Sequence, residues 1–295
     1  MAAIILDSNL LADQKNNQIK HSVDQRIHAG LLPPCLAVIL VGSDPASCVY
    51  VDAKKTASNR VGFETRILNL PETTSESELL AIVDTLNQDP VVHGILIQRP
   101  LPVALQTQAI IESILPHKDV DGLHPYNLGR LCQGNPLLRP CTPYGIMQLL
   151  EHYSLSVSGK HAVIIGASTL VGRPMALELL MANATVTICH RGTKSLEQHV
   201  RAADLLVVAT GIRDVIDTNW LVSKQIIVDV GIHRLENGGL CGDIDFKSAV
   251  QKVAGITPVP GGVGPMTVSS LLSNTLLAAN GRLNDGFIGS SNRYI

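Results

Sequence analysis

Leu36-Ala-Val-Ile-Leu-Val41 is followed, after Gly42, by Ser43-Asp-Pro-Ala-Ser-Cys-Val-Tyr-Val-Asp-Ala-Lys-Lys-Thr-Ala-Ser-Asn-Arg-Val-Gly62. The continuous apolar run is typical of a strand that is buried on both faces. Asp44 suits the N-cap of a helix, Pro45 its first position, and Gly62 its end. A buried strand that passes directly into a helix predicts an α/β fold with a parallel sheet.

Three polar side chains of the predicted helix lie on one face, because Ser47, Tyr50 and Lys54 are spaced i, i+3 and i+7. They follow the carboxyl end of a strand, which is where open α/β sheets bind ligands. Taken alone, the stretch favours an ordinary solvated helix face. The rest of the chain decides between the two interpretations.

The composition fits an α/β protein of about two domains at ~150 residues each. The 295 residues have a formal net charge of −2, and 3% of them are aromatic. No basic block indicates a nucleic-acid partner, and no apolar run approaches the roughly 20 residues of a membrane span. The six cysteines form no C-x-x-C pair and the ten histidines lack metal-ligand spacing. We therefore expect reduced thiols in a cytoplasmic protein, and an enzyme without a metal.

Strands and helices alternate along the chain in two series. In the first series, the strands are predicted at 36–41, 65–70 and 93–98, and the helices within the stretch 43–62 and at 79–86 and 107–114. Ser75 and Glu78 predict a capping box before residue 79. In the second series, the strands are predicted at 161–165, 185–189, 204–209 and 225–230, and the helices at 142–152, 174–181, 194–202 and 268–279. Thr142 and Pro143 are expected as N-cap and first residue of their helix.

The loop Gly166-Ala-Ser-Thr-Leu-Val-Gly172 is typical of a nucleotide site, since it joins a strand to a helix. Gly166 permits a tight turn, Ser168 can bind phosphate, and Gly172 allows close packing of helix on strand. The helix N-terminus attracts a pyrophosphate. The pattern Gly-x-Ser-x-x-x-Gly differs from Gly-x-Gly-x-x-Gly, and a purely structural turn explains it about as well.

The next strand indicates which dinucleotide is bound. It ends Ile188-Cys-His-Arg-Gly192, without the acid that binds the ribose of NAD. His190 and Arg191 can instead hold a 2′-phosphate, and Arg173 is a second possible partner or a surface residue. NADP is the expected cofactor.

Six segments in order resemble one family. Tyr50-x-x-x-Lys54 also occurs in short-chain dehydrogenases, but here it precedes the glycine-rich loop by a whole domain. The segments are Ser47-x-x-Tyr50-x-x-x-Lys54, Gln98-x-Pro-Leu-Pro102, Lys118-Asp-Val-Asp-Gly122, Pro140-Cys-Thr-Pro143, Gly166-x-Ser-x-x-Val-Gly172 and Pro258-Val-Pro-Gly-Gly-Val-Gly-Pro-Met-Thr267. Together they resemble the bifunctional methylenetetrahydrofolate dehydrogenase/cyclohydrolase family over almost the whole chain, to about residue 280.

The resemblance implies an N-terminal catalytic and folate-binding domain over 1–140 and a Rossmann-like NADP-binding domain over 141–267. A C-terminal helix over 268–282 is expected to return to the first domain, and the family forms homodimers. The implied activity belongs to one-carbon metabolism and supplies purine biosynthesis. A hydride passes from 5,10-methylenetetrahydrofolate to NADP⁺, and water then opens the 5,10-methenyl product to 10-formyltetrahydrofolate.

The resemblance also implies the residues of the folate side. Lys54 matches the proton-transfer group, and Gln98 the residue that hydrogen-bonds and tunes it. Tyr50 offers a flat ring to the pterin or aminobenzoyl group, and Asp121 matches the acid that binds the amino nitrogens of the pterin. Ser47 matches a substrate-side hydroxyl. Helix packing, a strand-end cap and an Asp-Gly turn are the structural alternatives at these positions.

On the cofactor side, Ile232 matches a backbone contact, and three residues are expected to form a wall against the nicotinamide and the folate: Pro260, Gly261 and Gly262. Three departures from the family pattern stand out. Arg99 replaces a usual Leu, Ala167 replaces an Arg that would contact phosphate, and Ile212-Arg213 replaces a basic-Pro pair. The loss at position 167 increases the expected contribution of Arg191.

Two other functions remain open at this point. One is a monofunctional folate dehydrogenase, and the other is a dinucleotide-sensing module without turnover. The presence of Lys54 and Gln98 argues against both, and a sensor would not need Tyr50 or Asp121.

Overall fold

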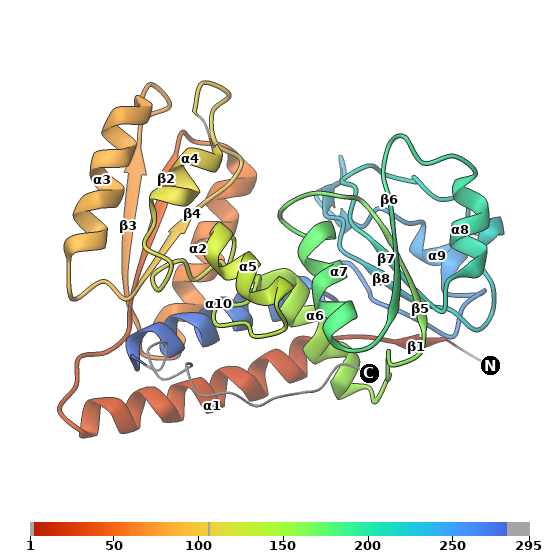
Figure 1. The fold of residues 1–295 in the computed structure, drawn as a ribbon, viewed down its shortest axis with the longest axis horizontal. Helices are drawn as coiled ribbons and strands as arrows, with labels where there is room; N and C mark the ends of the chain where they lie inside the picture. Colours follow the sequence, from red (N-terminus) through yellow and green to blue (C-terminus); the bar gives the residue numbers. More distant parts are fainter. Residues whose placement is uncertain (1–2, 106, 282–295) are drawn as a thin grey trace. The chain divides into compact units, whose positions relative to one another are not determined.

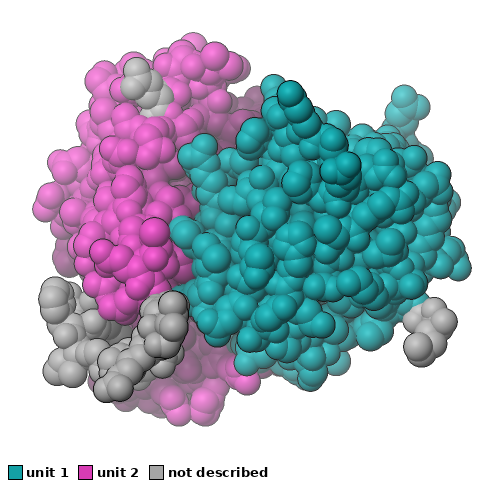
Figure 2. All heavy atoms as spheres, turned by 45° about the vertical axis from the view of Figure 1, so that its right-hand side comes forward, with its two compact units in different colours: residues 1–15, 140–270 teal, residues 16–139, 271–295 magenta. Residues whose placement is uncertain are grey.

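The computed structural model describes residues 3–105 and 107–281. The chain forms two compact units, which are coloured separately in Figure 2. The three-stranded unit comprises residues 16–139 and 271–295, and the six-stranded unit comprises residues 1–15 and 140–270. The expected α/β class with parallel sheets is confirmed in both units.

The three-stranded unit is built on a parallel sheet with the order β3-β2-β4 (Figure 1). Its strands are β2 (Cys35–Val41), β3 (Glu64–Leu70) and β4 (Gly94–Ile97). Its helices are α2 (Pro45–Arg60), α3 (Glu76–Gln88), α4 (Thr107–Ser113) and α5 (Pro125–Cys132). Alternate residues of β2, such as Ala37 and Ile39, pack against Val83 of α3 and Ile110 of α4. All seven residues of β2 are buried, as its apolar run predicts.

The six-stranded unit has the strand order β1-β11-β8-β7-β5-β6, with every neighbouring pair parallel. The strands are β1 (Ile4–Ile5), β5 (His161–Ile165), β6 (Thr185–Cys189), β7 (Leu205–Val208), β8 (Ile226–Asp229) and β11 (Gly255–Ile256). A separate antiparallel pair joins β9 (His233–Arg234) to β10 (Leu240–Cys241).

Helices cover both faces of this sheet (Figure 1). On one face, α6 (Cys141–His152) and α7 (Gly172–Met181) pack on Ala162 and Ile164. On the other face, α8 (Leu196–Ala202) and α9 (Phe246–Ala249) pack on Val163 and Ile165, and the 3-10 turn η1 (Thr218–Trp220) adds Trp220. Successive residues of β5 therefore face opposite helical layers, which is the arrangement of a doubly wound α/β domain.

Two long helices, α1 (Asn9–His28) and α10 (Gly264–Ala279), contain residues of both units. The expected return of the C-terminal helix is confirmed, since Asn274 on α10 donates hydrogen bonds to Val120 O (2.9 Å) and Arg139 O (2.8 Å) of the three-stranded unit. The expected end at residue 282 lies outside the described residues.

The first 15 residues group with the six-stranded unit, although the sequence suggested the N-terminal domain. The physical reason is a strand pairing, because Ile4 and Ile5 extend the sheet beside Gly255 and Ile256. A two-residue strand with a partner 251 residues away leaves no periodic signal in the sequence.

The helix caps show where local chemistry suffices for prediction. Asp44 caps α2 by accepting from Ser47 N at 2.8 Å, and Ser75 and Glu78 form the expected capping box of α3. Thr142 is not an N-cap: α6 already begins at Cys141, and Thr142 bonds Thr267 Oγ1 at 3.1 Å from inside the first turn.

All six cysteines are free thiols. Within residues 3–105 and 107–281, no helix combines the length and the apolar composition that a bilayer crossing requires.

Candidate functional site

The carboxyl edge of the three-stranded sheet carries a connected set of polar side chains. Lys54 of α2 donates to Gln98 Oε1 at 2.9 Å. Gln98, just after β4, donates from Nε2 to Arg99 O at 2.7 Å and from its backbone N–H to Ile39 O at 2.8 Å. Since the Nε2 donor is used by a carbonyl, Oε1 is the atom that faces Lys54.

Lys54 and its neighbour Lys55 differ in environment. Lys54 is half-buried and fixed by Gln98, whereas Lys55 is exposed. The helical spacing alone predicts that adjacent residues face different directions. Tyr50, one turn before Lys54, is 37% exposed, and burial of part of its ring raises the pKa of its phenol. Ser47 is buried, and its hydroxyl is 3.4 Å from Arg99 O.

The segment Lys118-Asp-Val-Asp-Gly122 runs parallel to β4. The backbones of Asp119 and Ile95 form a parallel β-bridge, and Ile95 N donates to Lys118 O at 2.8 Å. This register places Asp121 beside the end of β4, so it reaches the same edge as Gln98. Asp121 Oδ2 lies 3.9 Å from Arg99 Nη2. Strand pairing therefore brings together residues from three separate motifs.

The other charged residues of this segment have structural roles. The buried Lys118 ammonium donates to the carbonyls of Leu86, Asn87 and Asp89 at 2.8–3.0 Å, where α3 ends. Burial lowers the pKa of Lys118. Burial raises the pKa of Asp119, which accepts from Asn127 Nδ2 at 2.8 Å. Asp121 is left as the accessible acid of the motif.

In the six-stranded unit, the expected nucleotide loop lies between β5 and α7. Strand order reverses at β5, because β6 lies on one side of it and β7 on the other. This is the switch point where doubly wound sheets bind ligands. Gly166 has φ +119°, and a Cβ there would lie 2.2 Å from Ala209 O, at the start of the loop after β7. A Cβ on Gly172 would lie 1.9 Å from Gly166 O, which explains the second glycine.

Ser168 organises this loop. Its hydroxyl accepts the N–H groups of Val171 (3.1 Å) and Gly172 (3.4 Å). In the part of the chain that the structure describes, the backbone N–H groups of Thr169 and Leu170 form no hydrogen bond, and both residues are exposed. The loop therefore offers free donors, as a pyrophosphate requires.

The basic residues expected to bind a 2′-phosphate lie next to this loop. Cys189, the last residue of β6, pairs with Ile165 and accepts from Gly166 N at 3.0 Å. Arg191 follows two residues later and is exposed. His190 Nδ1 accepts from Gly192 N at 3.0 Å and shapes the turn. Arg173 donates from Nε to Ala167 O at 3.1 Å, so part of its guanidinium supports the loop itself.

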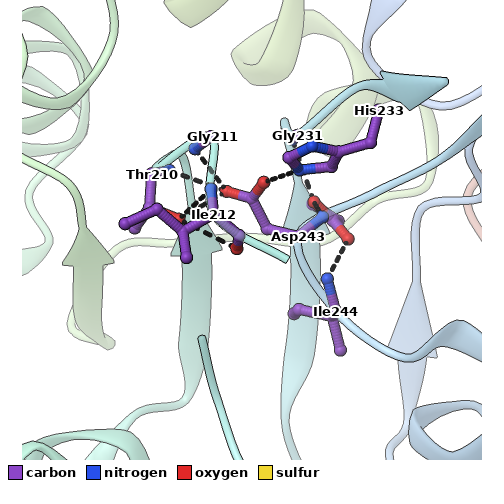
Figure 3. A network of polar contacts seen from close by, with 8 residues as sticks. Thr210, Gly211, Ile212, Gly231, His233, Asp243 and Ile244 are labelled. Carbon is purple, nitrogen blue, oxygen red and sulfur yellow. Dashed lines mark hydrogen bonds and ion pairs between the residues drawn. The ribbon is translucent and has the colours of Figure 1, made fainter. Parts of the chain in front are cut away.

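A buried carboxylate that was not predicted from the sequence, Asp243, joins the loops after β7 and β8 (Figure 3). Asp243 accepts from Thr210 N (2.7 Å), Thr210 Oγ1 (2.8 Å), Gly211 N (2.9 Å) and His233 Nε2 (2.7 Å). These bonds fix the segments that carry Ile212 and Ile232, whose side chains are 49% and 44% exposed. The sequence signal is limited to the acids of a Gly-Asp-Ile-Asp run at residues 242–245, well beyond the strand predicted at 225–230.

A second buried acid supports the first. Asp229 accepts the N–H groups of Gly231 (2.9 Å), Asp243 (3.0 Å) and Ile244 (2.9 Å). Burial raises the pKa of Asp229 to about 6, although the three donors oppose this shift.

Residues 260–262, the expected wall, form a loop in which the backbone conformation and close packing require the two glycines. Gly261 O accepts from Ser8 N (2.8 Å) and Ser8 Oγ (3.0 Å). A Cβ on Gly262 would lie 2.5 Å from Pro258 O. Pro260 is exposed, and the Val259-Pro260 peptide bond is cis. Among the described residues, no cluster of His, Cys, Asp and Glu has the arrangement of a metal site.

Comparison with known proteins identifies the family. Residues 6–121 match the model of the tetrahydrofolate dehydrogenase/cyclohydrolase catalytic domain, and residues 140–283 match that of its NAD(P)-binding domain. The "Bifunctional protein FolD" of Legionella pneumophila (strain Paris) is 54% identical over 279 residues, covering 95% of this chain and 98% of the relative.

Solved structures agree with this match. The FolD methylenetetrahydrofolate dehydrogenase/cyclohydrolase of Campylobacter jejuni superposes with a TM-score of 0.92 at 46% identity, over 95% of this chain and all of that one. The Trypanosoma brucei FolD complexed with NADP and inhibitor gives a TM-score of 0.91 at 33% identity, over 95% and 98% of the two chains. The family expected from the six motifs is confirmed, and the chain belongs to the tetrahydrofolate dehydrogenase/cyclohydrolase family.

Proposed function

We propose that this chain oxidises 5,10-methylenetetrahydrofolate with NADP⁺ and hydrolyses the 5,10-methenyl product to 10-formyltetrahydrofolate. Its family membership supports both activities, since the two matched models describe a dehydrogenase/cyclohydrolase. The observation that carries the proposal for this chain is the 2.9 Å bond from Lys54 to Gln98.

Lys54 is the proton-transfer group of the hydrolysis step. The methenyl carbon is a strong electrophile, so attack by water needs a base for the proton of water and an acid for the ring nitrogen. An amine can serve as both when its pKa lies near the working pH. Gln98 fixes the amine without adding a charge, because its oxygen is a neutral acceptor whose amide is itself held by Arg99 O. Water attack can then follow at a defined position.

Tyr50 and Asp121 bind the folate. The exposed part of the Tyr50 ring offers a flat apolar surface to the pterin or the aminobenzoyl group. Asp121 accepts hydrogen bonds from the amino edge of the pterin, which is a charge-assisted contact. Ser47 contributes a substrate-side hydroxyl, and Pro260, Gly261 and Gly262 border the reacting rings.

Bound NADP⁺ supplies the hydride acceptor, and the carboxyl edge of the six-stranded sheet holds it. The free N–H groups after Gly166 fit the pyrophosphate, with Ala167, Ser168 and Gly172 shaping that turn. Arg191 binds the 2′-phosphate, and Ile232 contributes a backbone contact. Asp243 acts indirectly, because it holds the segment next to Ile232 through His233.

A homodimer in the cytoplasm is part of the same proposal. It is supported by the family resemblance, and light scattering of the purified chain tests it by giving a mass near twice 31.5 kDa.

A coupled assay tests the proposed function. Purified chain is mixed with methylenetetrahydrofolate and either NADP⁺ or NAD⁺, and the methenyl product and its decay are followed by absorbance. The proposal predicts methenyl formation, faster with NADP⁺, and decay above the spontaneous rate. Formation without accelerated decay identifies a monofunctional dehydrogenase, and binding of NADP⁺ without formation identifies a sensing module.

A further inference from the structure

We propose that Arg99 determines which pterins this chain accepts, by donating a hydrogen bond to the 4-oxo group of the pterin beside Asp121. The inference rests on the proposed role of Asp121 and goes one step beyond it. Asp121 binds the N–H donors on one edge of the pterin. Arg99 binds the carbonyl acceptor on the same edge through its guanidinium Nη2, which has no other hydrogen-bond partner.

The first support is the geometry of the two charges. Arg99 Nη2 lies 3.9 Å from Asp121 Oδ2, which is too far for a hydrogen bond and near enough for charge attraction. The side chains are 22% and 28% exposed. The two side chains therefore lie close together and are both partly exposed. Arg99 Nη2 and Asp121 Oδ2 form no hydrogen bond with each other.

The second support is a hydrogen-bond donor of Arg99 that has no acceptor. Arg99 Nη2 has no hydrogen-bond partner and is covered by protein, so it reaches a ligand through rotation of the partly exposed side chain. A buried charged donor without an acceptor costs free energy, so its position favours a ligand that brings an acceptor. The backbone beneath it is fixed, because Arg99 O accepts from Gln98 Nε2 at 2.7 Å.

The third support is the chemistry of the ligand. A 2-amino-4-oxo pterin presents two N–H donors and then a carbonyl acceptor along one edge. A carboxylate can only accept, so Asp121 satisfies the donors and leaves the carbonyl unpaired. A guanidinium next to that carboxylate completes the edge. The leucine that the family usually has at position 99 cannot donate, so Arg99→Leu is the natural reference variant.

Simple neutralisation of Asp121 is the competing explanation. In that case Arg99 acts on the amino edge alone, and its removal affects 4-oxo and 4-amino pterins alike. The two explanations are separated by a matched pair of probes, folic acid and its 4-amino analogue, which share the 2-amino group and differ at position 4.

Calorimetric titration of both probes tests the proposal without requiring turnover, with the wild-type chain, Arg99→Leu and Arg99→Lys. We expect Arg99→Leu to weaken the binding of folic acid by about 10-fold or more, as for loss of one charge-assisted hydrogen bond. The affinity for the 4-amino analogue should change by less than about twofold. Arg99→Lys should recover part of the lost affinity for folic acid.

Equal weakening of both probes, no change in either, or no binding of folic acid to the wild-type chain would each overturn the role of Arg99. Failure of the proposed function is recognised separately, by the absence of methenyl formation in the coupled assay. Arg66→Leu serves as a surface control, because its guanidinium pairs with Asp89 instead.

Discussion

At the scale of single residues, the sequence predicted one contact of the candidate site and left others unforeseen. Lys54 and Gln98 were expected together, and they form a bond of 2.9 Å. The nearness of Arg99 to Asp121 was not foreseen, since it depends on the bridge that aligns residues 118–122 with β4. Ser168 also differs in detail, because its hydroxyl accepts from the N–H groups of its own loop.

Arg191 carries the prediction for cofactor choice. Arg191→Ala should weaken the binding of NADP⁺ by about 10- to 100-fold, as expected for loss of a charge-assisted phosphate contact. The binding of NAD⁺ should change by less than about twofold. Kinetic titration with both cofactors measures the two values. Arg201→Ala is the matched control, an exposed arginine that pairs with Glu197 on α8. Equal losses for NADP⁺ and NAD⁺ in Arg191→Ala would refute the 2′-phosphate role.

At the scale of elements, strands with long apolar runs were predictable and two-residue strands were not. The ranges expected for β2 and β5 agree with the structure to within one residue, because their burial leaves a continuous apolar run, and the range of the less buried β6 agrees as well. The strands β1 and β11 exist through pairing with distant partners, and α5 spans only eight residues, too few to define a helix by periodicity alone. The Asp243 network has the same origin, since it joins loops far apart in sequence (Figure 3).

Asp229 makes the stability of the six-stranded unit pH-dependent. Burial raises its pKa from 3.8 to about 6, so the folded state holds this proton more tightly than the unfolded state. The contribution is present at low pH and is lost as the pH rises through about 6. From pH 4.5 to 7.5, the free energy of unfolding of the wild type should fall by about 2 kcal/mol relative to Asp229→Asn.

Urea unfolding followed by fluorescence of Trp220 measures this difference, because the single tryptophan packs against the core of that unit. Asp245→Asn is an informative control. A hydrogen bond from Ser248 lowers the pKa of Asp245 below 3.8, so its contribution is lost only at more acidic pH, and the difference for Asp245→Asn should stay nearly constant from pH 4.5 to 7.5. A difference for Asp229→Asn that does not vary with pH would contradict the account.

At the scale of the whole molecule, the number of units and their class followed from two series of alternating strands and helices. The limits expected near residues 140 and 268 lie within three residues of the observed ones, whereas residues 1–15 belong to the other unit because β1 joins the sheet of the C-terminal series. A helix that belongs to two units has an unbroken local signal at the boundary, so composition cannot mark the division.

Asn274 tests how α10 is held. Asn274→Ala removes the hydrogen bonds to Val120 O and Arg139 O, and each lost bond costs about 0.5–1.5 kcal/mol. A drop of several degrees in the midpoint of thermal unfolding is expected. Asn280→Ala, which alters the exposed contact with Arg26, should change the midpoint far less. Similar midpoints for the two variants would argue against a structural role of Asn274.

The most direct test of the central claim is hydrolysis of 5,10-methenyltetrahydrofolate by Lys54→Ala, followed by the loss of methenyl absorbance. Lys55→Ala is the matched control, because it removes the adjacent, exposed lysine from the same helix. Circular dichroism confirms that both variants keep the fold. We predict at least about a 100-fold loss of hydrolysis in Lys54→Ala, as for removal of an acid–base group, and a rate within about twofold of wild type in Lys55→Ala. Undiminished hydrolysis by folded Lys54→Ala would contradict the assignment of Lys54 as the proton-transfer group.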